Sequence, residues 1–291
     1  MEAARPTFDL QSHSQHSDGA LVPADVVAAA AESGVELLAL TDHDSVEGVA
    51  EALAAARARG LRLIEAVEIT AIDEQQRDLH VLGYAIDHTD HLLRERLSTY
   101  RGQRENRADE IADAIRGLGF ALEESPLQER AAQGKSIGRP HLADAVVAHP
   151  ANAKRLAEEQ LEDRSAFLVA YLIEGKPAFV PRRGPSVAES INTIHDGRGM
   201  AIWAHPFWDI KDVAEVLSTI DAFIDLGLDG VECFYPTHTH EQTGLLAQRC
   251  EARRLLSTGS SDFHGPQHRE FSAFRAFDTY GYEPRLGPLA G

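Results

Sequence analysis

The sequence is poor in cysteine and has no long apolar run. Its two cysteines, Cys233 and Cys250, are too few for a disulfide framework and do not form a Cys-x-x-Cys metal motif. No stretch reaches the length of about 18 apolar residues that a membrane-spanning helix needs. The first twenty residues carry charged side chains where a signal peptide has an apolar core. We therefore expect a reduced, cytoplasmic protein that does not enter a membrane.

Basic side chains are also scarce, since 28 lysine and arginine residues stand against 46 aspartate and glutamate residues and leave a formal net charge of −18. A general nucleic-acid binder needs a broad basic face, and a protein that docks on anionic lipid needs a similar patch. The composition therefore disfavours long nucleic acids and membranes as partners. It permits a small anionic substrate held by a local group of cations or metal ions, and it leaves the oligomeric state open.

Three common catalytic patterns are missing as well. The sequence contains no Gly-x-Ser-x-Gly turn, no phosphate-binding loop ending in Gly-Lys-Ser/Thr, and no cysteine in a reactive setting. Catalysis by a nucleophilic serine or cysteine is thereby disfavoured. Histidine, in contrast, is abundant, with 14 residues and no tag-like run.

In both terminal parts of the chain, short apolar runs alternate with helical segments. Strands are predicted at residues 7–10, 37–40, 61–70, 79–84, 200–204, 230–234 and 255–258, and helices at 23–34, 46–59, 213–226 and 241–253. This alternation predicts a parallel sheet or barrel. Residues 91–174 instead show helical spacing with no convincing strand, which indicates a helical insertion.

These segments predict three parts of the chain. Residues 1–90 and 196–280 form a discontinuous barrel domain, and residues 91–195 form a mainly helical insertion that is expected to cap the barrel mouth. Residues 281–291, rich in glycine and proline, are expected to be a loose C-terminal tail.

Histidine and carboxylate residues recur close to the apolar runs. They are Asp9, His13, Asp18, Asp42, His43, Asp44, Glu68, His80, His205, Asp262 and His264. In a parallel barrel the carboxyl ends of the strands meet at one rim, so residues far apart in sequence become neighbours there. Imidazole nitrogen and carboxylate oxygen suit zinc, manganese or iron(II), and such ligands can hold two or three ions about 3.5–4 Å apart.

Five segments in order resemble motifs of the PHP (polymerase and histidinol phosphatase) superfamily. They are Asp-Leu-Gln-Ser-His-Ser with the following Ser-Asp-Gly at 9–19, Thr-Asp-His-Asp at 41–44, Ile-Gly-Arg-Pro-His at 137–141, Ala-His-Pro at 204–206 and Gly-Ser-Ser-Asp-Phe-His-Gly at 259–265. The resemblance covers residues 7–275. It implies a distorted seven-stranded (β/α) barrel with a helical insertion domain and a trinuclear metal site that hydrolyses phosphate monoesters and diesters. The segment 137–141 resembles the branch that acts on nucleoside 3′,5′-bisphosphates and short RNA ends.

The resemblance also implies three sets of metal ligands, of which the first two share Glu68. The sets are His13, Glu68 and Asp262; Glu68, His80 and His205; and Asp18, His43 and His264. Two or three divalent ions of manganese, iron or zinc are therefore expected. The chain departs from the family at Gln11, where a histidine is usual. A glutamine offers only a neutral carbonyl oxygen, so the first site is expected to be weaker, rearranged or empty.

Adjacent dications neutralise phosphoryl oxygens and lower the pKa of bound water, so water is the expected nucleophile. Asp42 and Asp44, beside His43, are candidates to orient an imidazole by a hydrogen bond. His238, in a loop that resembles a family position, is a further catalytic candidate. Trp203 is expected to pack in the barrel wall. Packing is also favoured for Trp208, with bordering a base as its alternative role.

A second phosphate on the substrate needs cationic partners away from the metals. Arg139 is the best candidate, because a guanidinium matches phosphate with two parallel hydrogen bonds. Its sequence neighbours Lys135, Ser136 and His141 are further candidates, as are Arg182 and Arg183 after the helical segment.

The sequence thus predicts a metal-dependent phosphatase that hydrolyses a phosphate monoester of a small nucleotide of the 3′,5′-bisphosphate type. Three alternatives stay open. The first is a 5′→3′ exonuclease on short RNA, and the second is a phosphatase of the histidinol-phosphate type. The third is a metal-binding protein with weakened catalysis, for which Gln11 is the only support.

Overall fold

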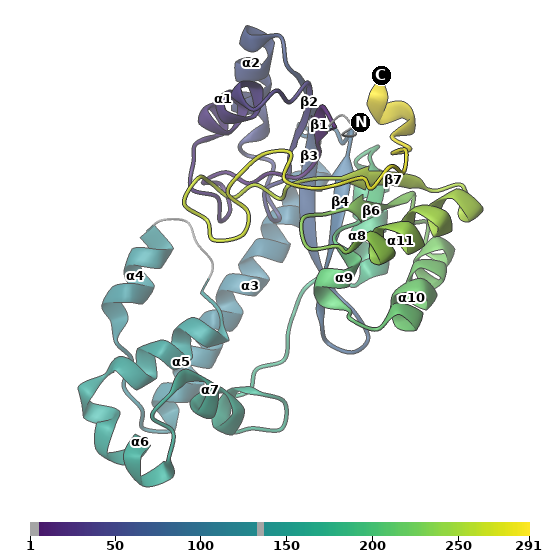
Figure 1. Cartoon of the computed structure of the whole chain (residues 1–291). Helices are drawn as coiled ribbons and strands as arrows, with labels where there is room; N and C mark the ends of the chain where they lie inside the picture. The colour runs from purple at the N-terminus through teal and green to yellow at the C-terminus, as the bar shows by residue number, and fades with distance from the viewer. Residues whose placement is uncertain (1–5, 133–136) are drawn as a thin grey trace. The chain divides into compact units, whose positions relative to one another are not determined.

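The computed structural model describes residues 6–132 and 137–291, and its seven strands form one sheet that curls into a nearly closed barrel (Figure 1). The strands follow one another around the sheet in chain order. They are β1 (Phe8–Asp9), β2 (Leu37–Leu40), β3 (Arg62–Ile72), β4 (Asp78–Tyr84), β5 (Met200–Trp203), β6 (Gly230–Phe234) and β7 (Leu256–Gly259). The predicted barrel is thereby confirmed.

The first and last strands approach each other through backbone hydrogen bonds. The Leu10 N–H donates to the Gly259 carbonyl at 3.2 Å, and the His13 N–H donates to the Phe263 carbonyl at 2.8 Å. Ser12 and Phe263 form an isolated parallel bridge just beyond the strands. The segments that follow β1 and β7 therefore lie side by side.

Strand β4 runs antiparallel to the other six strands. A parallel sheet had been expected, so this direction was not predicted. It pairs antiparallel with both β3 and β5, whereas the remaining neighbours pair in parallel. The reason is local, because residues 73–77 between β3 and β4 are too few for the crossover that a parallel pair requires. The amino end of β4 consequently lies where the other strands have their carboxyl ends.

Helices cover the outside of this sheet (Figure 1). They are α1 (Pro23–Glu32), α2 (Val49–Arg59), α8 (Val187–Asp196), the short α9 (Pro206–Asp209), α10 (Val213–Asp225) and α11 (His240–Arg253). Helices α1 and α2 are rich in alanine, which lets them pack closely on each other, with α1 against β2 and α2 against β3. Val26, Ala30, Leu38 and Ala52 belong to the resulting buried cluster.

The chain divides into two compact units, one of residues 1–99 with 185–291 and the other of residues 100–184. Helix α8 lies in the barrel unit and packs on β3, β4 and β5, although the sequence had placed it in the insertion. The reason is its amphipathic face, from which Ile191 and Ile194 are fully buried.

The C-terminal segment 281–291 is not the loose tail that was expected. It ends in a short 3-10 helix, η3 (Gly287–Ala290), whose Leu289 is buried. The Arg62 guanidinium donates to the carbonyls of Leu289 and Ala290, and Arg285 pairs with Ser257 at the edge of β7. One apolar anchor and these backbone contacts outweigh the flexibility of the glycine and proline residues.

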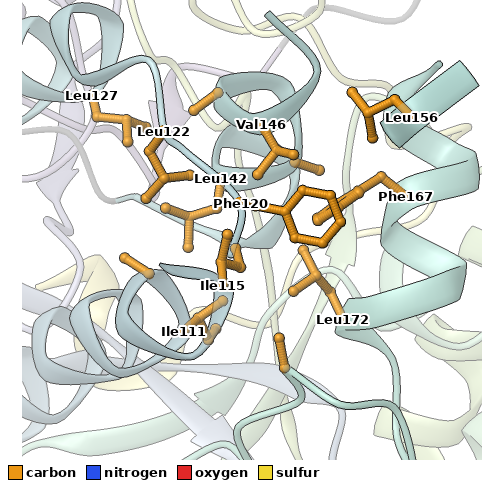
Figure 2. Close-up of a cluster of buried hydrophobic side chains, with 14 residues drawn as sticks. Ile111, Ile115, Phe120, Leu122, Leu127, Leu142, Val146, Leu156, Phe167 and Leu172 are labelled. Atoms are coloured by element: carbon orange, nitrogen blue, oxygen red, sulfur yellow. The ribbon is translucent and has the colours of Figure 1, made fainter. Parts of the chain in front are cut away.

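The second unit is helical, as predicted. It takes in the later part of α3 (His91–Gly117), which begins in the barrel unit, and contains α4 (Glu124–Ala132), α5 (Arg139–Ala148), η1 (Pro150–Asn152), α6 (Ala153–Glu159), α7 (Arg164–Phe167) and the π-helical turn η2 (Leu168–Leu172). Its own apolar core includes Ile115, Phe120, Leu142, Phe167 and Leu172 (Figure 2). The unit therefore has the buried core that an inserted domain requires.

Among the described residues, no helix combines the length and the apolar character that a membrane crossing requires. Both cysteines are buried and unbridged, with their Sγ atoms 3.6 Å apart.

Candidate metal centre

The barrel rim brings together all eight residues that were expected to bind metal. His13 and Asp18 follow β1, His43 follows β2, His205 follows β5, and Asp262 and His264 follow β7. Glu68 and His80 lie inside strands, on β3 and on the reversed β4. His80 reaches the rim because β4 begins there, where it pairs with Thr70 near the carboxyl end of β3.

The first expected set, His13, Glu68 and Asp262, forms a tight group. His13 Nε2 lies 3.2 Å from Glu68 Oε2 and 3.1 Å from Asp262 Oδ1. All three side chains are buried, and one donor atom from each lies within 4.8 Å of the other two. This spacing allows one ion to contact all three residues.

The second expected set centres on the other oxygen of Glu68. His80 Nδ1 lies 2.7 Å from Glu68 Oε1, and His205 Nε2 lies 3.5 Å from the same oxygen and 3.3 Å from His80 Nδ1. His43 joins Glu68 and His80 in a further group with metal-binding spacing. The two oxygens of Glu68 therefore face different sets of donors, as a bridging carboxylate requires.

The third expected set surrounds Asp18. His43 Nε2 lies 3.7 Å from Asp18 Oδ2, and His264 Nε2 lies 3.4 Å from Asp18 Oδ1. His13 stands beside them, with Nδ1 3.7 Å from Asp18 Oδ1, and joins this group as a fourth possible donor.

The donor atoms fit metal ions better than they fit one another. His13 Nε2 and Asp262 Oδ1 lie 3.1 Å apart, yet neither makes a hydrogen bond of good geometry with a described residue. Asp18 Oδ1 and His43 Nδ1 are buried and likewise lack a hydrogen bond in the described part of the chain. A buried polar atom without a partner is costly, and coordination would remove that cost. Nitrogen and oxygen donors in this mixture suit manganese, iron or zinc.

The charges of these groups also suit cations. Burial alone would raise the pKa of Glu68, but His43, His80 and His13 outweigh it and hold that pKa well below its usual value. The pKa of Asp18 is held well below its usual value in the same way, by His43 and His264 against burial. Burial lowers the pKa of His43 to about 3, so this imidazole is neutral and one of its ring nitrogens has a lone pair for coordination.

Two of the site residues have strained backbones. His205 has a φ of 28° and Asp262 a φ of 53°, both in a region that side-chain-bearing residues rarely adopt. His205 lies two residues after β5 and Asp262 three residues after β7, and the His205 N–H donates to Glu232 Oε2 at 2.9 Å. Such strain persists where a fold determines the position of a functional side chain.

Gln11 lies in the centre of this group and is only 1% exposed. Its Nε2 donates to Glu68 Oε2 at 2.9 Å, and its Oε1 accepts from the Ser260 hydroxyl at 3.3 Å. If the amide were flipped, its carbonyl oxygen would face the Glu68 carboxylate, and two acceptors would repel each other. The network therefore assigns the amide N–H to Glu68.

Two residues of the site were missed from the sequence. Glu232, fully buried on β6, lies 2.6 Å from the Ser260 hydroxyl, and burial raises its pKa to about 8. The Asp209 carboxylate lies 3.5 Å from His205 Nδ1. The signals were an acid inside the apolar run 230–234 and an acid four residues after His205.

Asp42 is placed differently from the expectation that it orients an imidazole directly. Its Oδ1 accepts hydrogen bonds from the Ser14 N–H and the Ser17 hydroxyl, and its Oδ2 accepts one from the Ser14 hydroxyl, all at 2.7 Å. Ser17 Oγ in turn lies 3.5 Å from His13 Nδ1. Asp42 thus stabilises the loop after β1 and reaches His13 only through Ser17, because both its oxygens are already occupied.

Asp44 and His238 are both buried in the barrel unit. Asp44 Oδ1 accepts a hydrogen bond from the Thr70 N–H at 3.1 Å and so ties the segment after β2 to β3. His238 Nδ1 donates to the Cys233 carbonyl at 3.1 Å, and burial lowers the pKa of His238 to about 4. Its Nε2 is buried without a hydrogen bond in the described residues.

The candidate phosphate ligands belong to the helical unit. Arg139 opens α5 and donates to the Leu172 carbonyl at 3.3 Å, while His141 Nδ1 accepts the Gly138 N–H at 3.0 Å. Arg183 pairs with Glu110 at 2.7 Å on an exposed surface. Arg182 lies beside it in the chain. Lys135 and Ser136 fall outside the described residues.

Comparison with known proteins agrees with this geometry. Residues 9–100 match the sequence profile of the PHP domain family. A 5′-3′ exoribonuclease of Haemophilus influenzae is 34% identical over 261 residues, which are 89% of this chain and 90% of that protein. A 3′,5′-nucleoside bisphosphate phosphatase of Chromobacterium violaceum is 30% identical over 259 residues, which are 89% of this chain and 87% of that protein.

A solved structure from Bifidobacterium adolescentis, assigned by its name to the metal-dependent phosphoesterases, has the same fold. It aligns with a TM-score of 0.68 and 27% sequence identity over 92% of this chain and 91% of its own.

Proposed function

Because the chain belongs to the PHP domain family and is a metal-dependent phosphoesterase, we propose that it hydrolyses one phosphate monoester of a small nucleotide of the 3′,5′-bisphosphate type. The observation that carries the proposal is the group of eight imidazole and carboxylate side chains around Glu68. The Chromobacterium relative, which is named for this substrate class, supports the choice of substrate.

We propose that these eight side chains hold two or three divalent ions, with His13 and Asp262 on one side of Glu68 and His80 and His205 on the other. The remaining three side chains, Asp18, His43 and His264, form the third set. Bound ions of this kind supply charge neutralisation at the phosphoryl oxygens and lower the pKa of water. The residues supply anionic oxygens, neutral imidazoles and a fixed geometry. Glu68 and Asp18 are ionised at neutral pH, as their lowered pKa values require.

Neighbouring residues hold the ligands in place. The Tyr235 hydroxyl donates to Asp262 Oδ2 at 2.8 Å, and Asp209 stands beside His205 Nδ1. Gln11 orients Glu68 by its amide N–H and does not itself provide a ligand. Such partners restrict the rotation of a ligand and tune its basicity. His238, with an unprotonated Nε2, remains the candidate to accept a proton.

The proposed roles of Arg139 and His141 concern the second phosphate. A guanidinium binds phosphate through paired hydrogen bonds and is charged at every physiological pH. In this role the two residues bind substrate without taking part in the bond cleavage. Discrimination between a bisphosphate and a simple phosphate ester would then depend on them.

The test compares initial rates on adenosine 3′,5′-bisphosphate, p-nitrophenyl phosphate and short RNA oligonucleotides, with manganese present. We expect the highest kcat/KM for the bisphosphate. Equal or absent activity on the bisphosphate would refute the substrate assignment. Activity that persists on oligonucleotides longer than about four units would favour the second candidate, a 5′→3′ exonuclease, to which the name of the Haemophilus relative points.

The alternative that the chain is a metal-binding protein with weakened catalysis makes a different prediction. It requires an inactive wild type and a Gln11→His variant with restored activity. We expect the opposite, namely an active wild type that contains two or more ions per chain by elemental analysis.

A further inference from the structure

A group of aromatic side chains lies beside the metal centre, and the proposed function leaves the faces of these rings without a role. Trp208 is on α9, Tyr235 follows β6, and His268 and Phe271 follow β7; we call these four residues the aromatic shelf. Phe271 is at its middle. Its ring centroid lies 5.6 Å from that of Trp208, 5.7 Å from Tyr235 and 5.3 Å from His268.

The shelf is continuous with the proposed ligands. The rings of His268 and Phe271 lie 5.1 Å and 5.7 Å from the ring of His264. On the other side, the ring of Tyr235 lies 5.2 Å from that of His205. A molecule whose phosphate is bound at the rim would therefore have the shelf within the reach of its next chemical group.

Trp208 is the part of the shelf that is open to solvent. It is 39% exposed, whereas the other tryptophan, Trp203, is fully buried in the barrel wall, as predicted. The indole is nevertheless held in place. The indole ring meets the Phe271 ring at an interplanar angle of 63° and the Tyr235 ring at 68°. The backbone N–H of Trp208 donates to the His205 carbonyl at 2.8 Å. An aromatic surface that is exposed and already ordered loses little entropy when it binds a ligand.

His268 is ordered in a similar way. It stacks on Phe271 with an interplanar angle of 13°, and its Nδ1 accepts the Phe271 N–H at 3.0 Å. The accepted hydrogen bond leaves Nε2 as the nitrogen that carries the hydrogen in the neutral ring. The exposed imidazole therefore adds a second planar group and a hydrogen-bond donor next to His264.

We propose that the aromatic shelf binds the nucleobase of the substrate by stacking, with Trp208 as the main contact. The inference rests on the proposed function, in which the phosphorylated substrate is a nucleotide. Planar aromatic groups bind bases of any identity, because every base presents a π-face. The shelf thus predicts that the enzyme distinguishes nucleotides from base-free sugar phosphates but discriminates only weakly between adenine, guanine, cytosine and uracil.

The first test uses the fact that the chain has only two tryptophans. Adenosine 5′-monophosphate and ribose 5-phosphate are titrated into metal-loaded protein while tryptophan fluorescence is followed. In Trp203→Phe, where Trp208 is the only emitter, we expect the nucleotide to change the emission and the base-free sugar phosphate to leave it unchanged. In Trp208→Phe, where only Trp203 emits, neither compound should change it. A nucleotide response that survives in Trp208→Phe and is absent from Trp203→Phe would overturn the proposal.

The second test is kinetic and does not depend on the stability of Trp203→Phe. Trp208→Ala should raise the KM for adenosine 3′,5′-bisphosphate by roughly tenfold to a hundredfold, the effect of removing one stacked aromatic group. It should leave the KM for ribose 3,5-bisphosphate and the kcat for both unchanged, and Trp208→Phe should retain most of the affinity. Tyr280→Ala is the matched control, because Tyr280 is 40% exposed and is not part of the shelf.

The two proposals fail in different ways. An equal rise in KM for both bisphosphates, or no rise, would refute the shelf while the turnover itself upholds the phosphatase. Absence of turnover in the wild type would refute the proposed substrate, and the fluorescence titration would still decide whether the shelf binds a base.

Discussion

The replacement of Gln11 by leucine tests what the buried amide of this residue contributes beside Glu68. Leucine has a similar volume but no amide, so Gln11→Leu removes the 2.9 Å hydrogen bond to Glu68 Oε2 and leaves the chain packed. The Glu68 carboxylate would then lose one of the contacts that fix its orientation. Since both of its oxygens face groups of donors, a rotation would disturb the contacts on both sides.

The size of the effect follows from the type of bond that is lost. A hydrogen bond to a buried charged group contributes about 1.5–3 kcal/mol, which is roughly a tenfold to hundredfold change in an equilibrium constant. Losses of a partner that orients a metal ligand fall in the same range of about 10–100-fold. We therefore expect manganese to bind Gln11→Leu roughly ten to a hundred times more weakly, with an unchanged number of ions per chain at saturation.

The assay is a manganese titration with elemental analysis, and two further variants make it decisive. Gln15→Leu is the matched control, because the Gln15 amide donates to the Ala20 carbonyl at 3.1 Å on the exposed side of the same loop. Ser260→Ala removes the anchor of the Gln11 carbonyl and should give a smaller loss than Gln11→Leu. The double variant Gln11→Leu/Ser260→Ala should bind manganese no more weakly than Gln11→Leu alone. The loss of one whole ion per chain in Gln11→Leu, with Ser260→Ala unaffected, would show that Gln11 is a ligand and refute the argument.

Three further predictions concern the other groups of the site. His205→Ala and Asp262→Asn should each lower kcat at least about a hundredfold, more than the loss of an orienting partner; near-normal turnover in either would remove that residue from the ligands. Arg139→Ala should raise the KM for the bisphosphate and spare kcat, and a collapse of kcat at saturating substrate would contradict a purely binding role. Burial lowers the pKa of His13 and His205, but nearby carboxylates outweigh it and hold both pKa values well above normal, so both rings are protonated at neutral pH without metal. Metal binding should therefore release protons and strengthen as pH rises; calorimetry in buffers of different ionisation enthalpy would contradict this if no proton were released.

Much of the fold could be predicted from the sequence because it depends on local signals. The strands at 37–40 and 230–234 were predicted with the bounds that the structure shows, since each is a short apolar run between turn residues. The direction of β4 and the packing of α8 on the sheet were not predicted. The first depends on a turn that is too short for a crossover, and the second on which sheet face remained uncovered.

For the site, the identity of the donors could be predicted, but their arrangement could not. Histidines and acids near strand ends pointed to a metal rim, and the structure brings all eight expected residues together. The grouping of His13 with Asp18 and of His43 with Glu68 emerged only in three dimensions. Asp42 was expected to orient an imidazole and instead holds the loop 14–17, because hydrogen bonds depend on distances that sequence spacing does not contain.

By itself, the sequence determined the chemistry of this protein. It specified that histidine and carboxylate side chains, which can bind metal, recur near the strands, and that the common motifs of a nucleophilic serine or cysteine are missing. It also specified that position 11 carries an amide instead of an imidazole. Only the tertiary structure decided how those side chains are used. It directed the Gln11 amide toward Glu68, buried Glu232 behind Ser260, and placed an exposed Trp208 next to His205 on the rim. The physical reason is that coordination, hydrogen bonding and stacking act over a few ångströms, and only the folded barrel brings residues on or next to seven separate strands within that range.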